Sequence, residues 1–296
     1  MNVLIKPEVI STIDGLRERI AAAKNRAEPG PGARVVLVPT MGALHAGHLS
    51  LVRRAHARGG IVVVSIFVNP LQFGPTEDLA SYPRTLDADV AALAAEGVAF
   101  VFAPEVSTMY PDGAADTRVT AGPVAALLEG AVRPGHFDGM LTVVTKLINI
   151  VGPDVVVFGQ KDAQQVFLVQ QAFADLNMRT EIEVVPIVRE PSGLALSSRN
   201  RRLEPTEKEA ALALSAALAA AVAAAPDGLQ AAQAAAHTIL AAQPLVKLDY
   251  LVVVSPQDFQ PVAAGFTGPA RMLVAAHVGS IRLIDNEAID LGSAPA

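Results

Sequence analysis

Continuous runs of branched apolar residues alternate with amphipathic segments along the first two thirds of the chain. The runs predict buried strands at 34–39, 61–67, 98–103, 154–159 and 181–188. Between them, apolar residues spaced three and four positions apart predict helices at 8–25, 86–96, 140–151 and 163–175, and one that ends near 58. Strands that are apolar on both faces and separated by helices are typical of parallel sheets. The pattern therefore predicts an α/β fold with a doubly wound parallel, Rossmann-like sheet.

The pattern changes beyond about residue 191. Two Ala-rich helices are predicted at 205–225 and 228–242, followed by strands near 248–254, 271–277 and 281–285. A turn at 277–280 would join the last two strands as a hairpin. We therefore expect a Rossmann-like domain over 1–188 and a second, smaller α+β C-terminal domain over 189–296.

Composition limits the function classes that suit this fold. The 296 residues are 51% hydrophobic and carry a formal net charge of −6, so nucleic acid is not an expected partner. Because there is no cysteine, disulfides, thiolate nucleophiles and cysteine-based zinc sites are excluded. The start of the chain lacks a signal-peptide pattern, and the apolar stretch at 210–225 is shorter than the roughly 20 residues of a membrane span. We expect a cytoplasmic enzyme without a membrane segment.

The turn after the first buried strand carries two histidines. In PTMGALHAGH, at 39–48, His45 and His48 fall at the start of a helix, where unpaired N–H groups and the helix dipole favour phosphate. Gly42 and Gly47 would let a ligand approach the backbone closely, and the imidazoles could donate hydrogen bonds to a phosphoryl group. A structural or surface role is the alternative. Zinc is disfavoured because HExxH spacing, cysteine and a nearby carboxylate are absent.

Two further segments with phosphate-binding side chains follow predicted strands. FGQKD, at 158–162, places Lys161 at the carboxyl edge of the sheet and Asp162 at a helix N-cap. ALSSRNRRL, at 195–203, combines hydroxyl groups with Arg199, a donor set suited to phosphate oxygens. No glycine-rich dinucleotide loop follows a strand, and no P-loop sequence occurs. Together the three segments favour an ATP site that uses neither of these loops.

These segments carry a resemblance to a known family. The turn at 39–48 resembles the HxGH signature of the nucleotidylyltransferase superfamily, which is related to class I aminoacyl-tRNA synthetases. Six more segments occur in order: FVNPLQFG (67–74), EDLASYPRT (77–85), LEGAVRPGHFDG (128–139), FGQKDAQQ (158–165), GLALSSRN (193–200) and RLIDN (282–286). With this set the chain resembles the pantothenate synthetase family over nearly its whole length.

The resemblance implies an activity and a set of site residues. The family condenses pantoate with β-alanine, using ATP and Mg²⁺, through an enzyme-bound pantoyl adenylate, and is typically homodimeric. The catalytic residues would be His45, His48, Lys161, Ser197, Ser198 and Arg199. ATP would be bound by these six and by Pro39, Thr40, Met41, Gly42, Gly47, Phe158, Gly159, Asp162, Val188 and Leu196. Pantoate and β-alanine would be bound by Met41, Phe67, Asn69, Gln72 and Gln165.

Three positions depart from the family pattern. Ala46 lies where an acidic residue is common between the two histidines, and Ala163 replaces an aromatic residue. Ala88 lies where a second carboxylate is common, which leaves Asp89 as the candidate Mg²⁺ ligand. None of the three departures removes a residue assigned to the chemistry.

Alternative functions remain at this point. Another HxGH nucleotidylyltransferase would share the turn at 39–48 but not the paired glutamines or the segment at 128–139. An aminoacyl-tRNA synthetase would need a basic surface and a KMSKS-like loop, to which SSRNR is only weakly similar. A catalytically inactive nucleotide-binding regulator is the third alternative. In the main interpretation, the smaller domain covers the ATP site.

Overall fold

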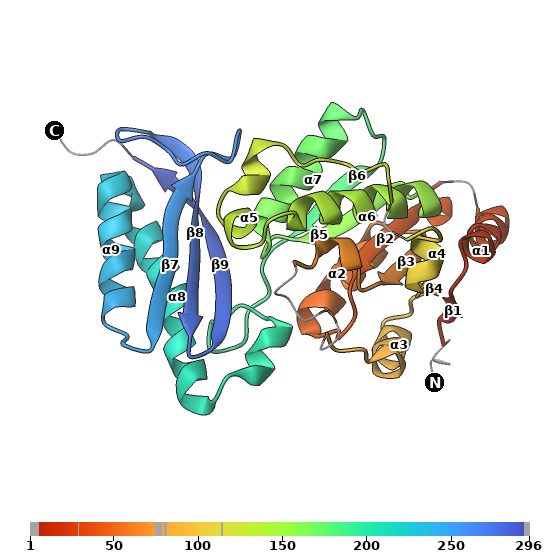
Figure 1. The fold of residues 1–296 in the computed structure, drawn as a ribbon, viewed down its shortest axis with the longest axis horizontal. Helices are drawn as coiled ribbons and strands as arrows, with labels where there is room; N and C mark the ends of the chain where they lie inside the picture. The colour runs from red at the N-terminus through yellow and green to blue at the C-terminus, as the bar shows by residue number, and fades with distance from the viewer. Residues whose placement is uncertain (1–5, 29, 75–78, 80–81, 114, 293–296) are drawn as a thin grey trace. The chain divides into compact units, whose positions relative to one another are not determined.

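The computed structural model of the chain describes residues 6–28, 30–74, 79, 82–113 and 115–292 (Figure 1). These residues form two compact units. Unit 1 comprises the chain up to residue 160 together with 168–186, and unit 2 comprises 161–167 together with the chain from residue 187 onward. The change at 186/187 lies two residues before the expected boundary after residue 188. The segment 161–167, expected in the first domain, is instead grouped with the C-terminal unit.

A six-stranded parallel sheet forms the centre of unit 1, in the order β1-β4-β3-β2-β5-β6. Its strands are β1 Glu8–Ile10, β2 Val35–Thr40, β3 Ile61–Ile66, β4 Phe100–Phe102, β5 Val155–Gly159 and β6 Glu181–Val185. The first four residues of β2 and of β5 are all buried, although successive side chains point to opposite faces of the sheet. Both faces of these strands are therefore covered, as is typical of parallel sheets. The predicted fold class is confirmed for this part of the chain.

The helices of this part of the chain are α1 Ile13–Arg26, α2 Ala46–Ala57, α3 Leu86–Ala95, α4 Val106–Met109, α5 Glu129–Val132, α6 His136–Val151 and α7 Ala163–Asp175, the last of which begins in the segment 161–167 of unit 2. Short 3₁₀ helices lie at η1 Pro31–Ala33, η2 Pro70–Gln72 and η3 Pro123–Ala126. Alternate β2 residues Val36 and Val38 share one hydrophobic cluster with Leu51 of α2 and Leu93 of α3. Because neighbouring strand residues point to opposite faces, the other β2 side chains point toward the helices on the opposite face of the sheet. Helix α6 contacts both β2 and α1.

The N-terminal part of unit 1 corrects one expectation. A single helix was predicted over 8–25, but residues 8–10 form β1, which pairs in parallel with β4. Thr12 separates the two elements, because its hydroxyl accepts a hydrogen bond from the N–H of Gly15 and caps α1. Ile10, counted as part of the helical pattern, is buried in the strand. Three residues carry too little periodicity to be recognised as a strand.

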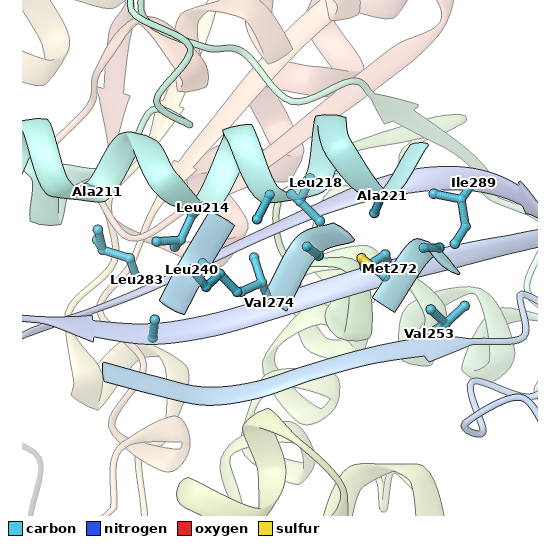
Figure 2. Packing of buried hydrophobic residues seen from close by; sticks show 14 of the residues in the cluster. Ala211, Leu214, Leu218, Ala221, Leu240, Val253, Met272, Val274, Leu283 and Ile289 are labelled. Carbon is cyan, nitrogen blue, oxygen red and sulfur yellow. The ribbon is translucent and has the colours of Figure 1, made fainter. Parts of the chain in front are cut away.

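Unit 2 contains an antiparallel sheet in the order β7-β8-β9. Its elements are η4 Ser198–Arg202, α8 Pro205–Ala224, η5 Ala225–Asp227, α9 Leu229–Ala241, β7 Val246–Val254, β8 Gly268–Val278 and β9 Ile281–Leu291. Residues Leu214 and Leu218 of α8 are directed toward Met272 and Val274 of β8 in one hydrophobic cluster (Figure 2). The smaller α+β domain is therefore confirmed, with strands β8 and β9 longer than predicted.

The Ala-rich helix α8 is the one helix among the described residues that is long and apolar enough to cross a membrane. Its residues Ala210, Ala211, Leu214, Ala217, Leu218 and Ala221 are buried in the cluster shared with the sheet and α9. Its apolar face is thus part of the core of unit 2. This agrees with the expectation of an Ala-rich helix at 205–225.

Candidate active site

The sheet order places the ends of β2 and β5 side by side. These two strands pair at the centre of the sheet, where the order of connections reverses. Such a reversal is where open α/β sheets bind ligands, beyond the carboxyl ends of the strands. Strand β2 includes Pro39 and ends at Thr40, and β5 includes Phe158 and ends at Gly159. Four of the predicted ATP-binding residues therefore lie at this edge.

His45 and His48 cap helix α2. Nδ1 of His45 accepts a hydrogen bond of 3.1 Å from the N–H of Gly47, and Nδ1 of His48 accepts one of 3.3 Å from the N–H of His45. The ring centroids are 4.1 Å apart. Because each Nδ1 is an acceptor, a neutral ring carries its proton on Nε2, which is then a donor. The histidines are structural caps at the N-terminus of α2, and their role as donors to phosphate stays a prediction.

The loop before the histidines is held by Asp89, a residue of α3. Its carboxylate accepts hydrogen bonds from the N–H groups of Ala43 (3.0 Å) and Leu44 (2.8 Å) and from the hydroxyl of Thr85 (3.1 Å). Gly42 and Ala43 both have positive φ, at 84° and 51°. A Cβ on Gly42 would lie 3.1 Å from the carboxylate. The carboxylate thus stabilises a conformation that costs free energy for Ala43.

Asp89 does not suit the Mg²⁺ site expected from the resemblance. It is 3% exposed, and both of its carboxylate oxygens already accept hydrogen bonds. Over the ranges that the structure describes, no three histidine or acidic side chains are grouped closely enough to hold a metal ion. Mg²⁺ prefers several oxygen ligands and retains waters, and a buried, hydrogen-bonded carboxylate offers it little.

Four of the five predicted pantoate residues form a second group in unit 1, and the fifth, Gln165, belongs to unit 2. Asn69 Nδ2 donates to Gln72 Oε1 (3.2 Å) and to the carbonyl of Gly139 (3.0 Å). Gln72 Nε2 lies 3.1 Å from the sulfur of Met41, which is a weak acceptor. Both amides are buried. The structure therefore brings Met41, Asn69 and Gln72 together, and the amide group of Gln72 is oriented by its neighbours.

Tyr110 supports this group and was not predicted from the sequence. Its hydroxyl donates a hydrogen bond of 2.8 Å to Oδ1 of Asn69. Burial raises the pKa of Tyr110 to about 12, partly opposed by the charge of Arg118. The hydroxyl thus stays a donor at neutral pH. Phe67, another predicted residue, is buried with its ring centroid 6.2 Å from that of Tyr110.

The segment 128–139 holds the backbone of the same group. His136 Nδ1 is 2.8 Å from the carbonyl oxygen of Gln72. Gly139 packs so closely that a Cβ there would lie 2.1 Å from the carbonyl oxygen of Leu71. Only glycine permits this approach of α6 to η2. The motif LEGAVRPGHFDG therefore positions the Gln72 turn.

Three of the four predicted phosphate-binding residues of unit 2 line one pocket, and Ser198 is the one that does not. Lys161, Ser197 and Arg199 lie in it with Asn200 and Arg282. Ser197 caps η4 by accepting a hydrogen bond of 3.2 Å from the N–H of Arg199. The remaining lining residues are Leu194, Ala195, Leu214, Leu283, Ile284 and Asp285. Three positive side chains and a hydroxyl in one pocket, beside the carboxylate of Asp285, suit a phosphate group.

The other predicted residues of unit 2 are placed by backbone contacts. The N–H of Leu196 bonds to the carbonyl of Val188, which closes the turn that precedes Ser197. Asp162 immediately precedes α7, and its carbonyl accepts a hydrogen bond from Val166. Gln165 lies in the first turn of α7 and is half-buried, and Ser198 is the first residue of η4. Their binding roles stay predictions.

A buried ion pair in unit 2 was also missed. Arg189 makes two hydrogen bonds to Asp285, of 2.6 and 3.1 Å, and a third, of 3.3 Å, to Glu287. Burial disfavours the charge on Arg189, but the hydrogen bonds and charges of the two carboxylates outweigh it and raise the pKa. The ion pair links Arg189, which follows the segment predicted as a strand at 181–188, to strand β9. Nothing in local sequence links positions 189 and 285, so only the tertiary structure reveals it.

Comparison with known proteins places this geometry in a family. The sequence model of the family described as Pantoate-beta-alanine ligase matches residues 8–288. A pantothenate synthetase of Leifsonia xyli subsp. xyli is 59% identical over 285 residues, which cover 96% of this chain and 97% of that protein. One from Mycolicibacterium smegmatis is 57% identical over 273 residues, with coverages of 92% and 86%.

Solved structures of proteins with the same names are also similar to this chain. The pantothenate synthetase of Thermus thermophilus has a TM-score of 0.85 at 45% identity, covering 95% of this chain and 98% of its own. The pantoate-beta-alanine ligase of Francisella tularensis, in complex with beta-gamma ATP and beta-alanine, has a TM-score of 0.74 at 35% identity, with coverages of 95% and 97%. With nearly every segment of the chain matched, and with the histidine cap, the Gln72 group and the Lys161 pocket all formed, the chain belongs to the pantoate-beta-alanine ligase family.

Proposed function

We propose that this chain is an AMP-forming ligase that joins pantoate to β-alanine through a pantoyl adenylate. A carboxylate oxygen of pantoate attacks the α-phosphorus of ATP, and diphosphate leaves. The amine of β-alanine then attacks the acyl carbon, losing a proton as the amide forms, and AMP leaves. Its relatives named pantothenate synthetase, and a similar structure described with beta-gamma ATP and beta-alanine, support the substrates.

The observation that carries the proposal is the pair of histidine caps at the N-terminus of α2. The carboxylate of pantoate is ionised at neutral pH, so adenylation needs no general base. It needs donors where charge grows on the phosphates. Nε2 of His45 and of His48 supply such donors, and Nδ1 of each ring is held by the backbone. The loop therefore presents fixed rather than rotating donors.

Unit 2 supplies the positive charges of the proposal. Lys161 and Arg199 line one pocket, where they would neutralise charge on the triphosphate and the departing diphosphate. Ser197 adds a hydroxyl, and Ser198 is the next residue along η4. Gly159, Asp162 and Val188 would border the nucleoside.

The Gln72 group of unit 1 gives the proposal its substrate selectivity. Gln72 would bind the hydroxyl and carboxylate groups of pantoate together with Gln165. Its Oε1 accepts a hydrogen bond from Asn69, but its Nε2 lies against the weakly accepting sulfur of Met41, so a ligand oxygen is the better partner for Nε2. A buried amide is costly without a full partner, and this favours a polar acid over an apolar one.

Magnesium enters the proposal with ATP. When bound, Mg²⁺ would neutralise charge on the β- and γ-phosphates. Because Asp89 does not suit a metal site, the phosphates and waters would provide its ligands. The proposal includes a homodimer, which the resemblance to the family implies, and a cytoplasmic location, which the composition favours.

The test is the release of diphosphate from ATP by the purified chain. We expect release that depends on pantoate, with pantothenate formed once β-alanine is added. Other carboxylates and tRNA serve as controls. Release that is independent of pantoate, or that requires tRNA, would overturn the proposal and favour another HxGH enzyme. Light scattering of the same sample tests the dimer.

A further inference from the structure

The RLIDN segment of β9 has polar residues inside an apolar core. Asp285 and Asn286 are 4% and 2% exposed, and their strand neighbours Leu283 and Ile289 belong to the hydrophobic cluster of unit 2. Burying such groups costs free energy unless each finds partners. Each of these two consecutive side chains therefore needs polar partners within unit 2.

Asn286 links two separate parts of unit 2. Its Nδ2 donates a hydrogen bond of 2.9 Å to the carbonyl oxygen of Lys161, 125 residues away in sequence. Its Oδ1 accepts one of 2.7 Å from Nη1 of Arg271 on β8. Only an amide can donate and accept in this way at this length of side chain. Burial lowers the pKa of Arg271, partly opposed by the charge of Glu287, and the Asn286 amide gives this half-buried guanidinium an acceptor without adding a charge.

The neighbouring residue of β9 holds the other phosphate-binding segment. Asp285 binds Arg189, from which the chain turns back toward Ser197 and Arg199. Asp285 itself lines the pocket that contains Lys161, Ser197 and Arg199. Two consecutive residues of one strand thus anchor the two stretches of chain that carry the pocket's polar groups. The segment 161–167, which contains Lys161, is grouped with unit 2, to which β9 belongs.

We propose that Asn286 is a positioning residue for Lys161 in the adenylation step. Its amide fixes the carbonyl of Lys161, and with it the direction from which the side chain enters the pocket. A displacement of about 1 Å in a catalytic group can cost on the order of 10²-fold in rate. The inference rests on the proposed function, because it assigns Lys161 to adenylation.

Asn286→Asp separates the two bonds of the amide. The variant has nearly the same shape and keeps an acceptor for Arg271, because a carboxylate would pair with the half-buried guanidinium. It loses the donor to Lys161 and places an oxygen against the carbonyl. We expect the rate of adenylate formation in a single turnover to fall by about 10-fold or more, with the KM for pantoate unchanged. Asp290→Asn, a one-atom exchange at an exposed position of the same strand, should leave the rate unchanged.

A double-mutant cycle distinguishes positioning from general destabilisation. In a Lys161→Ala background, Asn286→Asp should have no further effect on adenylation, because the group that it positions is absent. Equal effects in both backgrounds, or a near-normal rate for Asn286→Asp alone, would overturn the proposal. If Asn286→Asp fails to fold by circular dichroism, Asn286→Ala removes the donor to Lys161 together with the acceptor for Arg271 and carries the same expectations for adenylation. Absence of pantoate-dependent activity in the unmodified chain would reject the proposed function instead.

Discussion

The carboxylate of Asp89 accepts a hydrogen bond of 3.0 Å from the N–H of Ala43, a residue with a φ of 51°. The bond joins α3 to the loop that leads into His45. Without it, the left-handed backbone at Ala43 loses its compensation, and the loop can relax away from the geometry that the histidines need. The same carboxylate is the position where the resemblance places a metal ligand, so its variants distinguish the two roles.

Asp89→Asn should lower the rate of adenylation by about 10-fold or more, because an amide nitrogen would face an N–H donor. The Mg²⁺ concentration for half-maximal rate should stay the same, since the carboxylate holds the loop and not the metal. Asp87→Asn, on the exposed side of the same helix turn, is the matched control and should have no effect. A large rise in the Mg²⁺ requirement of Asp89→Asn would instead restore the metal-ligand role.

His48→Ala should slow adenylation by roughly 10²-fold, the usual cost of losing one preorganised donor to a transition state. The loss of its Nδ1 cap should also lower the melting temperature slightly. His56→Ala, an exposed histidine in the last turn of the same helix, provides the comparison. Single-turnover rates near normal in a folded His48→Ala chain would remove His48 from the mechanism.

Gln72→Leu should raise the KM for pantoate far more than the KM for ATP, because the lost hydrogen bonds are to one ligand only. The same split is expected for Gln165→Leu. Gln171→Leu, an exposed position on α7, is a control for the change of side chain. Initial rates with each substrate varied in turn make the test, and equal increases in both KM values would contradict the assignment to pantoate.

Tyr110→Phe removes the hydrogen bond that orients Asn69, so the KM for pantoate should rise several-fold. The pH dependence offers an independent measurement. The chain has three tyrosines, and a spectrophotometric titration should show one with a pKa of about 12 that is missing from Tyr110→Phe. Since the unfolded phenol titrates near 10, the folded state retains the proton longer, and stability should fall as pH rises from 10 to 12. Tyr110→Phe should lack this part of the fall.

ATP and pantoate together should protect the backbone amides of residues 193–203 from hydrogen exchange, as expected if the smaller domain covers the ATP site. Arg199→Ala should lose this protection together with affinity for ATP. Arg202→Ala, an exposed arginine at the end of η4, is the comparison. Exchange that is the same with and without both ligands would reject closure of this loop over the ligands.

The sequence predicted the fold where hydrophobic runs are long. Strand β2 and strand β5 are buried on both faces, and this leaves a continuous apolar run that is easy to recognise. Strand β1 was missed because its three residues adjoin a helix with the same apolar character. The longer ends of β8 and β9 are set by pairing between the two strands, which a single-strand pattern does not contain.

The candidate site, too, was predicted from the sequence only in part. His45, Gln72 and Lys161 stand out because histidine, amide and lysine side chains follow predicted strands. The groups that orient them come from distant positions: Tyr110 lies 41 residues from Asn69, and Asn286 lies 125 residues from Lys161. The resemblance made Asp89 a candidate Mg²⁺ ligand. Its main partners are backbone N–H groups, which no pattern of side chains reveals.

The grouping of 161–167 with unit 2 also limits how this protein can be recombined. A chimera joined at residue 187 would combine Lys161 from one parent with β9 from the other, and the bond from Asn286 to Lys161 would then cross between the parental sequences. The C-terminal unit is therefore not an interchangeable module bounded by a single peptide bond. A chimera that keeps its function has to take both stretches of chain from the same parent. Substitutions that accumulate in one stretch therefore limit which substitutions the other can accept.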